Sequence, residues 1–318
     1  MTYNELWHRL SGIYDAGEAR AITRLVLEEQ YGMTLTDIVS GKVEELSPEE
    51  QEQLEEIFNR LEKAEPVQYV LGKETFAGRT FTVSSQTLIP RPETAELCEW
   101  VRLSVEKGKS PTEAKETALT KILDIGTGTG CIAITLSLDM MGADVEAWDL
   151  SAAALHTART NAERLGAHVN VRKQDALNPP TADNGVWDVI VSNPPYICLK
   201  EEKDMARNVL EYEPRMALFV PDENPLLFYR SIAHYARHAL KPQGMLFFEI
   251  NPIYVKETLD MLKEEGFGSA DTRNDMFGKI RFVKAIQERQ PRENQEPNRK
   301  HLPHSLPSAR KPNTARRK

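Results

Sequence analysis

The residues best suited to chemistry are Asn193-Pro194-Pro195-Tyr196, which end an apolar run that begins at Val189. A residue before proline is held out of the helical region, so the backbone aims the Asn193 amide. The prolines carry no N–H, so fewer local donors compete for the nearby carbonyls. The Asn193 side-chain oxygen and the Pro194 carbonyl then suit the two hydrogens of a planar –NH2 group, with Tyr196 stacking on it. Such a tetrapeptide is also common as a simple turn, so its interpretation depends on a second motif.

The second motif is a glycine-rich loop between an expected strand at 121–125 and an expected helix at 130–141. Its residues are Gly126, Thr127, Gly128, Thr129 and Gly130. Glycines let the chain turn tightly and let a ligand approach the bare backbone. A dinucleotide fingerprint would need glycine at Cys131, and a phosphate-binding P-loop would need Gly-Lys-Ser/Thr; neither is present. The spacing instead fits a loop that holds S-adenosylmethionine.

Acidic residues lie at the ends of the next two expected strands. Asp149 ends the strand at 145–149, where a carboxylate can accept both ribose hydroxyls of a nucleoside. Asp175 suits the adenine amino group, and the Ala176 N–H suits a ring nitrogen. With Asn193, these residues form the expected cofactor contacts. Asp124 is equally consistent with a cofactor contact and with a cap of the following loop or helix.

Strands and helices alternate from residue 121 onward. Strands are expected at 121–125, 145–149, 169–174, 187–192, 244–250, 268–274 and 278–285, and helices at 130–141, 152–165, 224–240 and 253–265. This alternation predicts an α/β fold with a mainly parallel, seven-stranded sheet and helices on both faces. Ligands of such sheets lie beyond the carboxyl ends of the strands, where Asn193 also lies.

The rest of the chain divides by composition. Residues 1–72 show apolar positions at helical spacing and predict a small helical bundle, either a scaffold or a docking module for a macromolecular substrate. Residues 73–93 predict a β-hairpin linker around Gly78. Residues 94–287 form the expected catalytic domain, with a solvated connector at 106–120. Residues 288–318 are expected to be a disordered basic tail.

The 318-residue chain has 40% hydrophobic residues and a net charge of −8. Its acidic body disfavours binding to phosphate backbones, so no specific nucleic acid is expected. The tail holds nine Lys or Arg and three Asp or Glu, and weak contact with RNA is the alternative to a bland solvated tail. No window is apolar enough to span a bilayer, and the start lacks the order of a secretory signal. A cytoplasmic protein without membrane contact is therefore expected.

Neither the cysteines nor the histidines predict a metal site. Cys98, Cys131 and Cys198 form no CxxC pair and are expected to be small packed residues. His234 and His238 lie four apart on an expected helix, but the glutamate of an H-E-x-x-H motif is missing.

The combined motifs resemble those of S-adenosylmethionine-dependent methyltransferases that modify amino groups, which implies a Rossmann-like sheet. The wider set resembles the release-factor glutamine N5-methyltransferases, the PrmC/HemK family, as far as about residue 285. This set comprises Gln68–Gly72, Leu88–Glu93, Asp124–Gly130, Asn193–Tyr196, Glu213–Leu218 and Arg281–Val283.

The resemblance implies methylation of the glutamine in the Gly-Gly-Gln motif of class 1 peptide chain release factors. Asn193, Pro194 and Tyr196 would be catalytic, and Pro195 would also contact the substrate. Two features depart from the family pattern: Ala176 replaces an aromatic residue of some members, and Phe248-Glu-Ile-Asn-Pro252 lacks the usual glycine after Glu-Ile.

Three alternatives remain. The first two are methylation of a glutamine in a ribosomal protein and of an adenine in nucleic acid; the acidic body argues against the latter. The third is a non-catalytic binding module built on a degenerate methyltransferase core, against which the intact glycines, Asp149 and Asn193 argue.

Overall fold

The computed structural model describes residues 1–108 and 119–288. Residues 1–288 form one compact unit. The expected connector at 106–120 falls mostly outside the described residues, as does the expected tail. Within the described ranges, none of the helices combines the length and the hydropathy needed to cross a membrane.

The chain begins with a helical bundle, as the apolar spacing predicts. Its elements are α1 (Tyr3–Leu10), α2 (Ala16–Tyr31), α3 (Leu35–Val39), η1 (Lys42–Glu45), α4 (Pro48–Leu61) and α5 (Val67–Leu71). Capping boxes at Thr2, Thr34 and Ser47 satisfy the first N–H groups of α1, α3 and α4 and so fix where these helices begin. The inward faces of the helices share one apolar core that includes Leu6, Leu27 and Phe58.

A short hairpin follows, with strands β1 (Lys73–Phe76) and β2 (Arg79–Thr82) paired antiparallel. Ala77 and Gly78 both have positive φ, 47° and 74°, as a two-residue hairpin turn requires. The predicted hairpin is therefore present around Gly78, although it ends at Thr82 and an irregular segment continues to α6 (Pro92–Gly108).

The main sheet has seven strands in the order β10-β11-β9-β6-β3-β4-β5. The strands are β3 (Thr120–Ile125), β4 (Ala143–Asp149), β5 (Val169–Lys173), β6 (Trp187–Ser192), β9 (Leu240–Glu249), β10 (Ser269–Asn274) and β11 (Ile280–Ile286). The five strands from β9 to β5 are parallel, and β11 is antiparallel to both of its neighbours. The predicted mainly parallel, seven-stranded sheet is thus confirmed.

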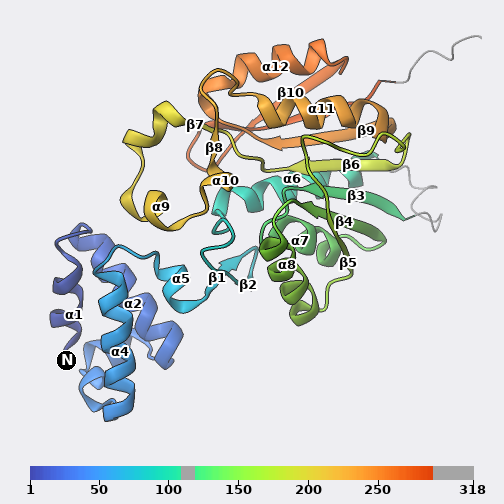
Figure 1. Ribbon diagram of the computed structural model, residues 1–318. Helices are drawn as coiled ribbons and strands as arrows, with labels where there is room; N and C mark the ends of the chain where they lie inside the picture. The colour runs from blue at the N-terminus through green and yellow to red at the C-terminus, as the bar shows by residue number, and fades with distance from the viewer. Residues whose placement is uncertain (109–118, 289–318) are drawn as a thin grey trace, which may run out of the picture. The chain divides into compact units, whose positions relative to one another are not determined.

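Helices cover both faces of the sheet (Figure 1). One face packs against α6, α7 (Cys131–Asp139) and α8 (Ala152–Leu165), and the other against α11 (Leu227–Ala239) and α12 (Val255–Glu264), which a short turn η4 (Pro252–Tyr254) precedes. Neighbouring strand residues alternate between the two cores: Ile122 packs into the first and Leu123 into the second. Because both faces are covered, the central strands read as continuous apolar runs.

The segment 197–220 holds several short elements for which the sequence gave no expectation. They are β7 (Ile197–Cys198), η3 (Leu199–Asp204), α9 (Arg207–Tyr212), α10 (Arg215–Leu218) and β8 (Phe219–Val220), with β7 and β8 paired parallel. Elements of two to six residues are too short to show helical or strand periodicity, so the pattern missed them.

Strand β9 also begins four residues earlier than the expected 244–250. Leu240 pairs with Trp187 before an irregularity in the register, and the pairing resumes at Met245. Proline is disfavoured inside a strand, as at Pro242, and Gln243 has a φ of 66°, so the strand is irregular here.

Candidate functional site

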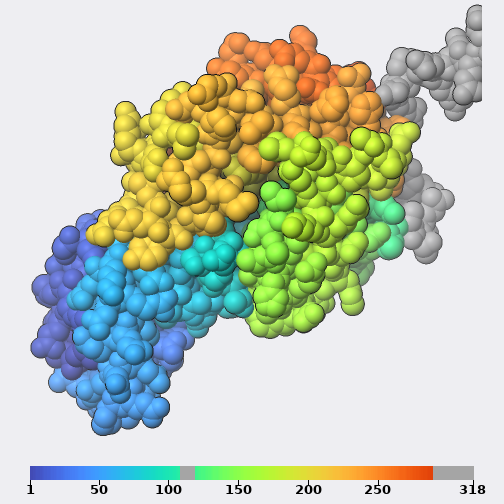
Figure 2. Space-filling model, viewed as in Figure 1, coloured from blue at the N-terminus to red at the C-terminus, as the bar shows by residue number. Residues whose placement is uncertain are grey.

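An open pocket lies at the carboxyl ends of β3, β4 and β6, where parallel sheets bind their ligands. It holds about 840 Å³ of space between atoms. Figure 2 shows the surface hollowed where green, gold and cyan segments of the chain converge. Eight of the sequence-predicted residues line it: Gly126, Gly128, Asp149, Asp175, Ala176, Asn193, Pro194 and Pro195.

The glycine loop presents two of its residues to the pocket and turns the others inward. Thr127 is buried, and its hydroxyl donates to Asp124 Oδ2 over 2.6 Å. Thr129 is also buried, and its carbonyl accepts from the Asn161 side chain. Gly130 begins α7 with a φ of 83°, and a Cβ there would lie 2.8 Å from Ile134 Cδ1. Thr127, Thr129 and Gly130 therefore shape the loop without lining the pocket.

Asp124 lies beneath the loop and caps it. Its Oδ2 also accepts from the backbone N–H of Ala133 in the first turn of α7, over 3.2 Å. Its Oδ1 is buried without a hydrogen-bond partner among the described residues. Burial raises the pKa of Asp124 to about 7, although the Thr127 and Ala133 donors oppose the rise. The sequence was equally consistent with a cofactor contact and with a cap at Asp124, and the structure shows the cap.

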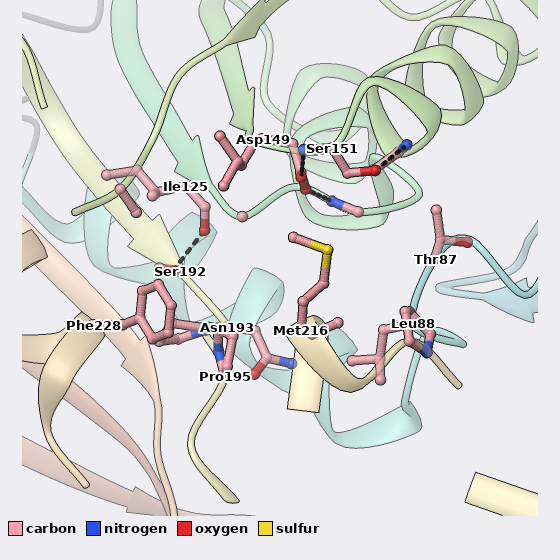
Figure 3. A pocket seen from close by; sticks show the side chains of 18 of the residues that line it. Thr87, Leu88, Ile125, Asp149, Ser151, Ser192, Asn193, Pro195, Met216 and Phe228 are labelled. Carbon is pink, nitrogen blue, oxygen red and sulfur yellow. Dashed lines mark hydrogen bonds between the residues drawn. The ribbon is translucent and has the colours of Figure 1, made fainter. Parts of the chain in front are cut away.

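Asp149 faces the pocket from the end of β4 (Figure 3). Its Oδ2 accepts from the Gly128 N–H and its Oδ1 from the Ser151 N–H, each over 2.9 Å. Burial raises the pKa of Asp149, and the backbone donors act in the opposite direction. A carboxylate oxygen can accept more than one hydrogen bond, so both oxygens keep acceptor capacity toward the pocket.

Asp175 and Ala176 lie on the same wall, after β5. The Asp175 carboxylate accepts from the Leu177 N–H over 2.8 Å and from Asn178 Nδ2 over 2.6 Å, so it closes a local turn. The Ala176 carbonyl accepts from Ser231 Oγ of α11 over 2.7 Å. These bonds fix the segment against the pocket; the adenine contacts expected of Asp175 and Ala176 stay predictions.

Asn193 and Pro194 border two pockets at once. The second pocket lies next to the first and is also lined by Leu88, Arg91 and Tyr196. Asn193 Nδ2 donates to Thr94 Oγ1 near the start of α6, over 3.3 Å. Asn193 and Pro194 thus lie between the pocket that contains the glycine loop and the second pocket.

Tyr196 lines the second pocket and not the first. Its hydroxyl donates to Glu249 Oε1 over 3.2 Å, and its carbonyl accepts from Asn251 Nδ2 over 3.2 Å. Burial raises the pKa of Tyr196, which keeps the phenol protonated and able to donate. Asn251 stands at the position where the family pattern has glycine. Its side chain therefore adds a hydrogen bond to the Tyr196 backbone that a glycine could not make.

Several pocket residues were not identified from the sequence as candidates. Figure 3 shows the Met216 side chain extending toward the Asp149 side of the pocket, with Leu88 to the right of it and Phe228 to the left of Asn193. Met216 is 59% exposed. Leu88 and Met216 belong to sequence motifs on which the family resemblance rests, so those motifs could have identified them as site residues. Phe228 is an isolated apolar residue, and nothing in the sequence marks it as part of a site.

Asn161 is a further residue that the sequence did not single out. It is fully buried on α8, and its Oδ1 accepts from the Thr82 N–H over 2.8 Å. Its Nδ2 donates to the carbonyls of Thr82 and Thr129, each over 3.0 Å. Asn161 therefore ties the hairpin to the glycine loop.

Among the residues that the structure describes, no group of three or more His, Cys, Asp or Glu could hold a metal ion. The rings of His234 and His238 lie 5.9 Å apart on α11, and His234 Nδ1 lies 3.2 Å from Oε2 of Glu265, the C-cap of α12. Cys98, Cys131 and Cys198 are buried free thiols, as expected.

Two family models match the chain. The Methyltransferase small domain matches residues 112–216, and the PrmC N-terminal domain matches residues 4–72. In a solved structure of the hMettl16 catalytic domain with the MAT2A 3'UTR hairpin 1, the similar part covers 65% of this chain and 74% of that one, at 18% identity and a TM-score of 0.51. This likeness concerns the fold.

Relatives similar over most of their length are more informative. A release factor glutamine methyltransferase of Bacteroides thetaiotaomicron is 43% identical, covering 87% of this chain and 95% of the relative. Proteins of the same name from Flavobacterium psychrophilum and Bacillus subtilis are 39% and 33% identical, covering 86% and 87% of this chain and 94% of each relative. The chain belongs to the release factor glutamine methyltransferase family.

Proposed function

We propose that this chain methylates N5 of the glutamine in the Gly-Gly-Gln motif of class 1 peptide chain release factors, in the cytoplasm, with S-adenosylmethionine as methyl donor. The observation that carries the proposal is the position of Asn193 and Pro194 between two adjoining pockets. One pocket suits the methyl donor and the other a side chain that ends in –NH2.

The residues of the pocket that contains the glycine loop suit S-adenosylmethionine. Gly126 and Gly128 offer bare backbone, and both have positive φ, 78° and 56°. The Asp149 oxygens keep acceptor capacity for the ribose hydroxyls, and Ala176 offers its backbone N–H beside the space expected for adenine. When bound, S-adenosylmethionine supplies a sulfonium methyl and a neutral leaving group.

The protein's main task is then to position the substrate nitrogen. An amide nitrogen is a poor nucleophile because its lone pair is delocalised into the carbonyl. Asn193 Oδ1 and the Pro194 carbonyl accept the two –NH2 hydrogens and hold the nitrogen toward the glycine-loop pocket, and Tyr196 packs on the amide plane. Alignment of this kind contributes on the order of 7–11 kcal/mol to a reaction of two groups.

The same acceptors select glutamine over glutamate. A glutamate carboxylate brings no hydrogens to Asn193 Oδ1 or the Pro194 carbonyl, so the acceptors would face its negative charge unpaired. We propose that residues 1–72 form a docking domain that selects the release factor, that 73–93 link it to a catalytic domain at 94–287, and that neither membrane nor specific nucleic acid takes part.

The test is mass spectrometry of unmodified recombinant release factor after incubation with the protein and S-adenosylmethionine. The expected result is one added methyl group on the Gly-Gly-Gln glutamine, and a release factor with asparagine at that position serves as the matched control. Methylation elsewhere, or none, would refute the proposal. Parallel reactions with ribosomal proteins and with nucleic acid measure the two alternative substrates.

A further inference from the structure

A chain of three hydrogen bonds runs behind Asn193, of which the middle one is buried and the outer two are partly buried. Asn193 Nδ2 donates to Thr94 Oγ1, the Thr94 hydroxyl donates to Glu249 Oε2 over 2.6 Å, and the Tyr196 hydroxyl donates to Glu249 Oε1. Thr94 and Glu249 are each 2% exposed, so water does not compete for the bond between them. Glu249 ends β9, and it is absent from the lining of both pockets.

The donors and acceptors fix the direction of this chain. An ionised carboxylate only accepts hydrogen bonds, and a threonine hydroxyl has one hydrogen to donate. Once that hydrogen goes to Glu249, Thr94 Oγ1 can only accept, and its partner on Asn193 must be the –NH2 group. The Asn193 oxygen is then left on the other side of the amide.

We propose that Glu249 is a positioning residue: through Thr94 it makes Asn193 present its oxygen, and not its –NH2 group, to the substrate amide. The inference rests on the proposed function, because an acceptor at Asn193 matters for a substrate that brings an –NH2 group. It adds a role to Glu249 and Thr94, which touch neither substrate nor cofactor. It also makes the preference for glutamine over glutamate depend on a carboxylate outside the pocket.

The surroundings of Glu249 bear on its ionised state. The pKa of Glu249 is raised, chiefly by burial and also by Glu93, while the Thr94 hydroxyl, the Arg281 guanidinium and the Tyr196 hydroxyl act in the opposite direction. Tyr229 faces the same residue and donates to its carbonyl over 3.0 Å. A protonated Glu249 would donate to Thr94 and allow the chain to reverse, so activity should fall on the acid side.

The substitution Glu249→Gln tests the direction of these hydrogen bonds, because glutamine has nearly the same shape as glutamate. The glutamine –NH2 can donate to Thr94, whose hydrogen then turns to Asn193 and flips the amide. We expect kcat on release factor to fall by about a hundredfold or more, as when one preorganised polar contact to a reacting group is lost. Binding of S-adenosylmethionine should stay unchanged, and binding should shift from the Gly-Gly-Gln release factor toward a Gly-Gly-Glu variant.

Three further variants distinguish an effect of hydrogen-bond direction from an effect of side-chain packing. Thr94→Val breaks the chain with similar volume and should lose activity, whereas Thr94→Ser keeps the hydroxyl and should restore it. Glu146→Gln is the matched control, because Glu146 also accepts a short bond, from Trp148 Nε1, but lies outside both pockets. Equal loss in the serine and valine variants, or full kcat in Glu249→Gln, would overturn the inference.

Neutron diffraction of the wild-type protein measures the direction of the hydrogen bonds directly, because it locates the deuterium atoms. The expected map has deuterium on Thr94 Oγ1 pointing to Glu249 and the Asn193 –ND2 group pointing to Thr94. Deuterium pointing from Thr94 to Asn193 would overturn the inference whatever the activity. If the wild type methylates no release factor, the proposed function fails, and the neutron map still decides the direction of the chain.

Discussion

The Asp149 carboxylate accepts a hydrogen bond from the backbone N–H of Gly128 over 2.9 Å, so the acid that ends β4 holds the glycine loop that follows β3. The two strands are paired in parallel, with Ile125 opposite Trp148, which brings their carboxyl ends together. One side chain thus both orders the loop and faces the pocket. Loss of Asp149 should therefore affect cofactor binding in two ways.

We expect Asp149→Asn to raise the Kd for S-adenosylmethionine about 10- to 100-fold, since a hydrogen bond to a charged group contributes about 1.5–3 kcal/mol. The amide keeps one acceptor but turns –NH2 hydrogens toward donors. Isothermal titration calorimetry measures the change. Asp144→Asn, on an exposed part of the same strand, is the control; an equal Kd in all three proteins would rule out a cofactor role for Asp149.

Asn193→Ala separates binding from transfer. The change removes the side-chain acceptor between the two pockets but leaves the glycine loop and Asp149 in place, so methyl transfer should be abolished while the Kd for S-adenosylmethionine changes little. Radiolabelled methyl transfer and calorimetry provide the two measurements. Asn170→Ala, at an exposed site on β5, is the matched control. If binding and transfer fell together, Asn193 would be chiefly a cofactor residue.

The sequence located Asp149 and Asn193 because each lies at the carboxyl end of a strand with a strong local signal: Asp149 is the last residue of β4, and Asn193 directly follows β6. Val189–Val191 is β-branched and uncharged, and the prolines after Asn193 mark the strand's end. In a parallel sheet, residues in that position must gather at one edge, so strand order was not needed to place them in one site.

Glu249, Asn161 and Met216 were harder to assign because their roles depend on distant partners. Glu249 accepts from Thr94, 155 positions away, and Asn161 bonds Thr82, 79 positions away. Local periodicity carries no information on such pairs. Met216 lies on a four-residue helix within the segment where the pattern predicted no elements.

Asn161→Ala should destabilise both the fold and the loop. It leaves the Thr129 carbonyl without this partner in a buried place and the Thr82 N–H and carbonyl without it in a partly buried one, and a buried unsatisfied group costs about 1–3 kcal/mol. We expect the free energy of unfolding in urea to fall by about 2–3 kcal/mol or more, with a weaker affinity for S-adenosylmethionine. Asn170→Ala again serves as the control. Unchanged stability would mean that water replaces the side chain.

Asp124 supplies a pH-dependent contribution to stability. Burial raises its pKa from an ordinary 3.8 to about 7, and the neighbouring Asp149 adds to the rise. The folded protein therefore holds a proton on Asp124 at pH values where the unfolded chain has lost it. Stability from this group is full below about pH 4 and falls as the pH rises toward 7, because the folded state binds more protons there.

Asp124→Asn should remove this dependence, because an amide does not titrate. We expect the stability of the wild type relative to the variant to decrease between about pH 4 and 7 and to level off above that, with about 1.4 kcal/mol for each unit of pKa difference. Urea unfolding of both proteins across this range measures the difference, and the comparison cancels the titration of groups common to both. Parallel curves for the two proteins would mean that Asp124 is ionised in the folded state throughout, with its buried Oδ1 reached by a donor such as water.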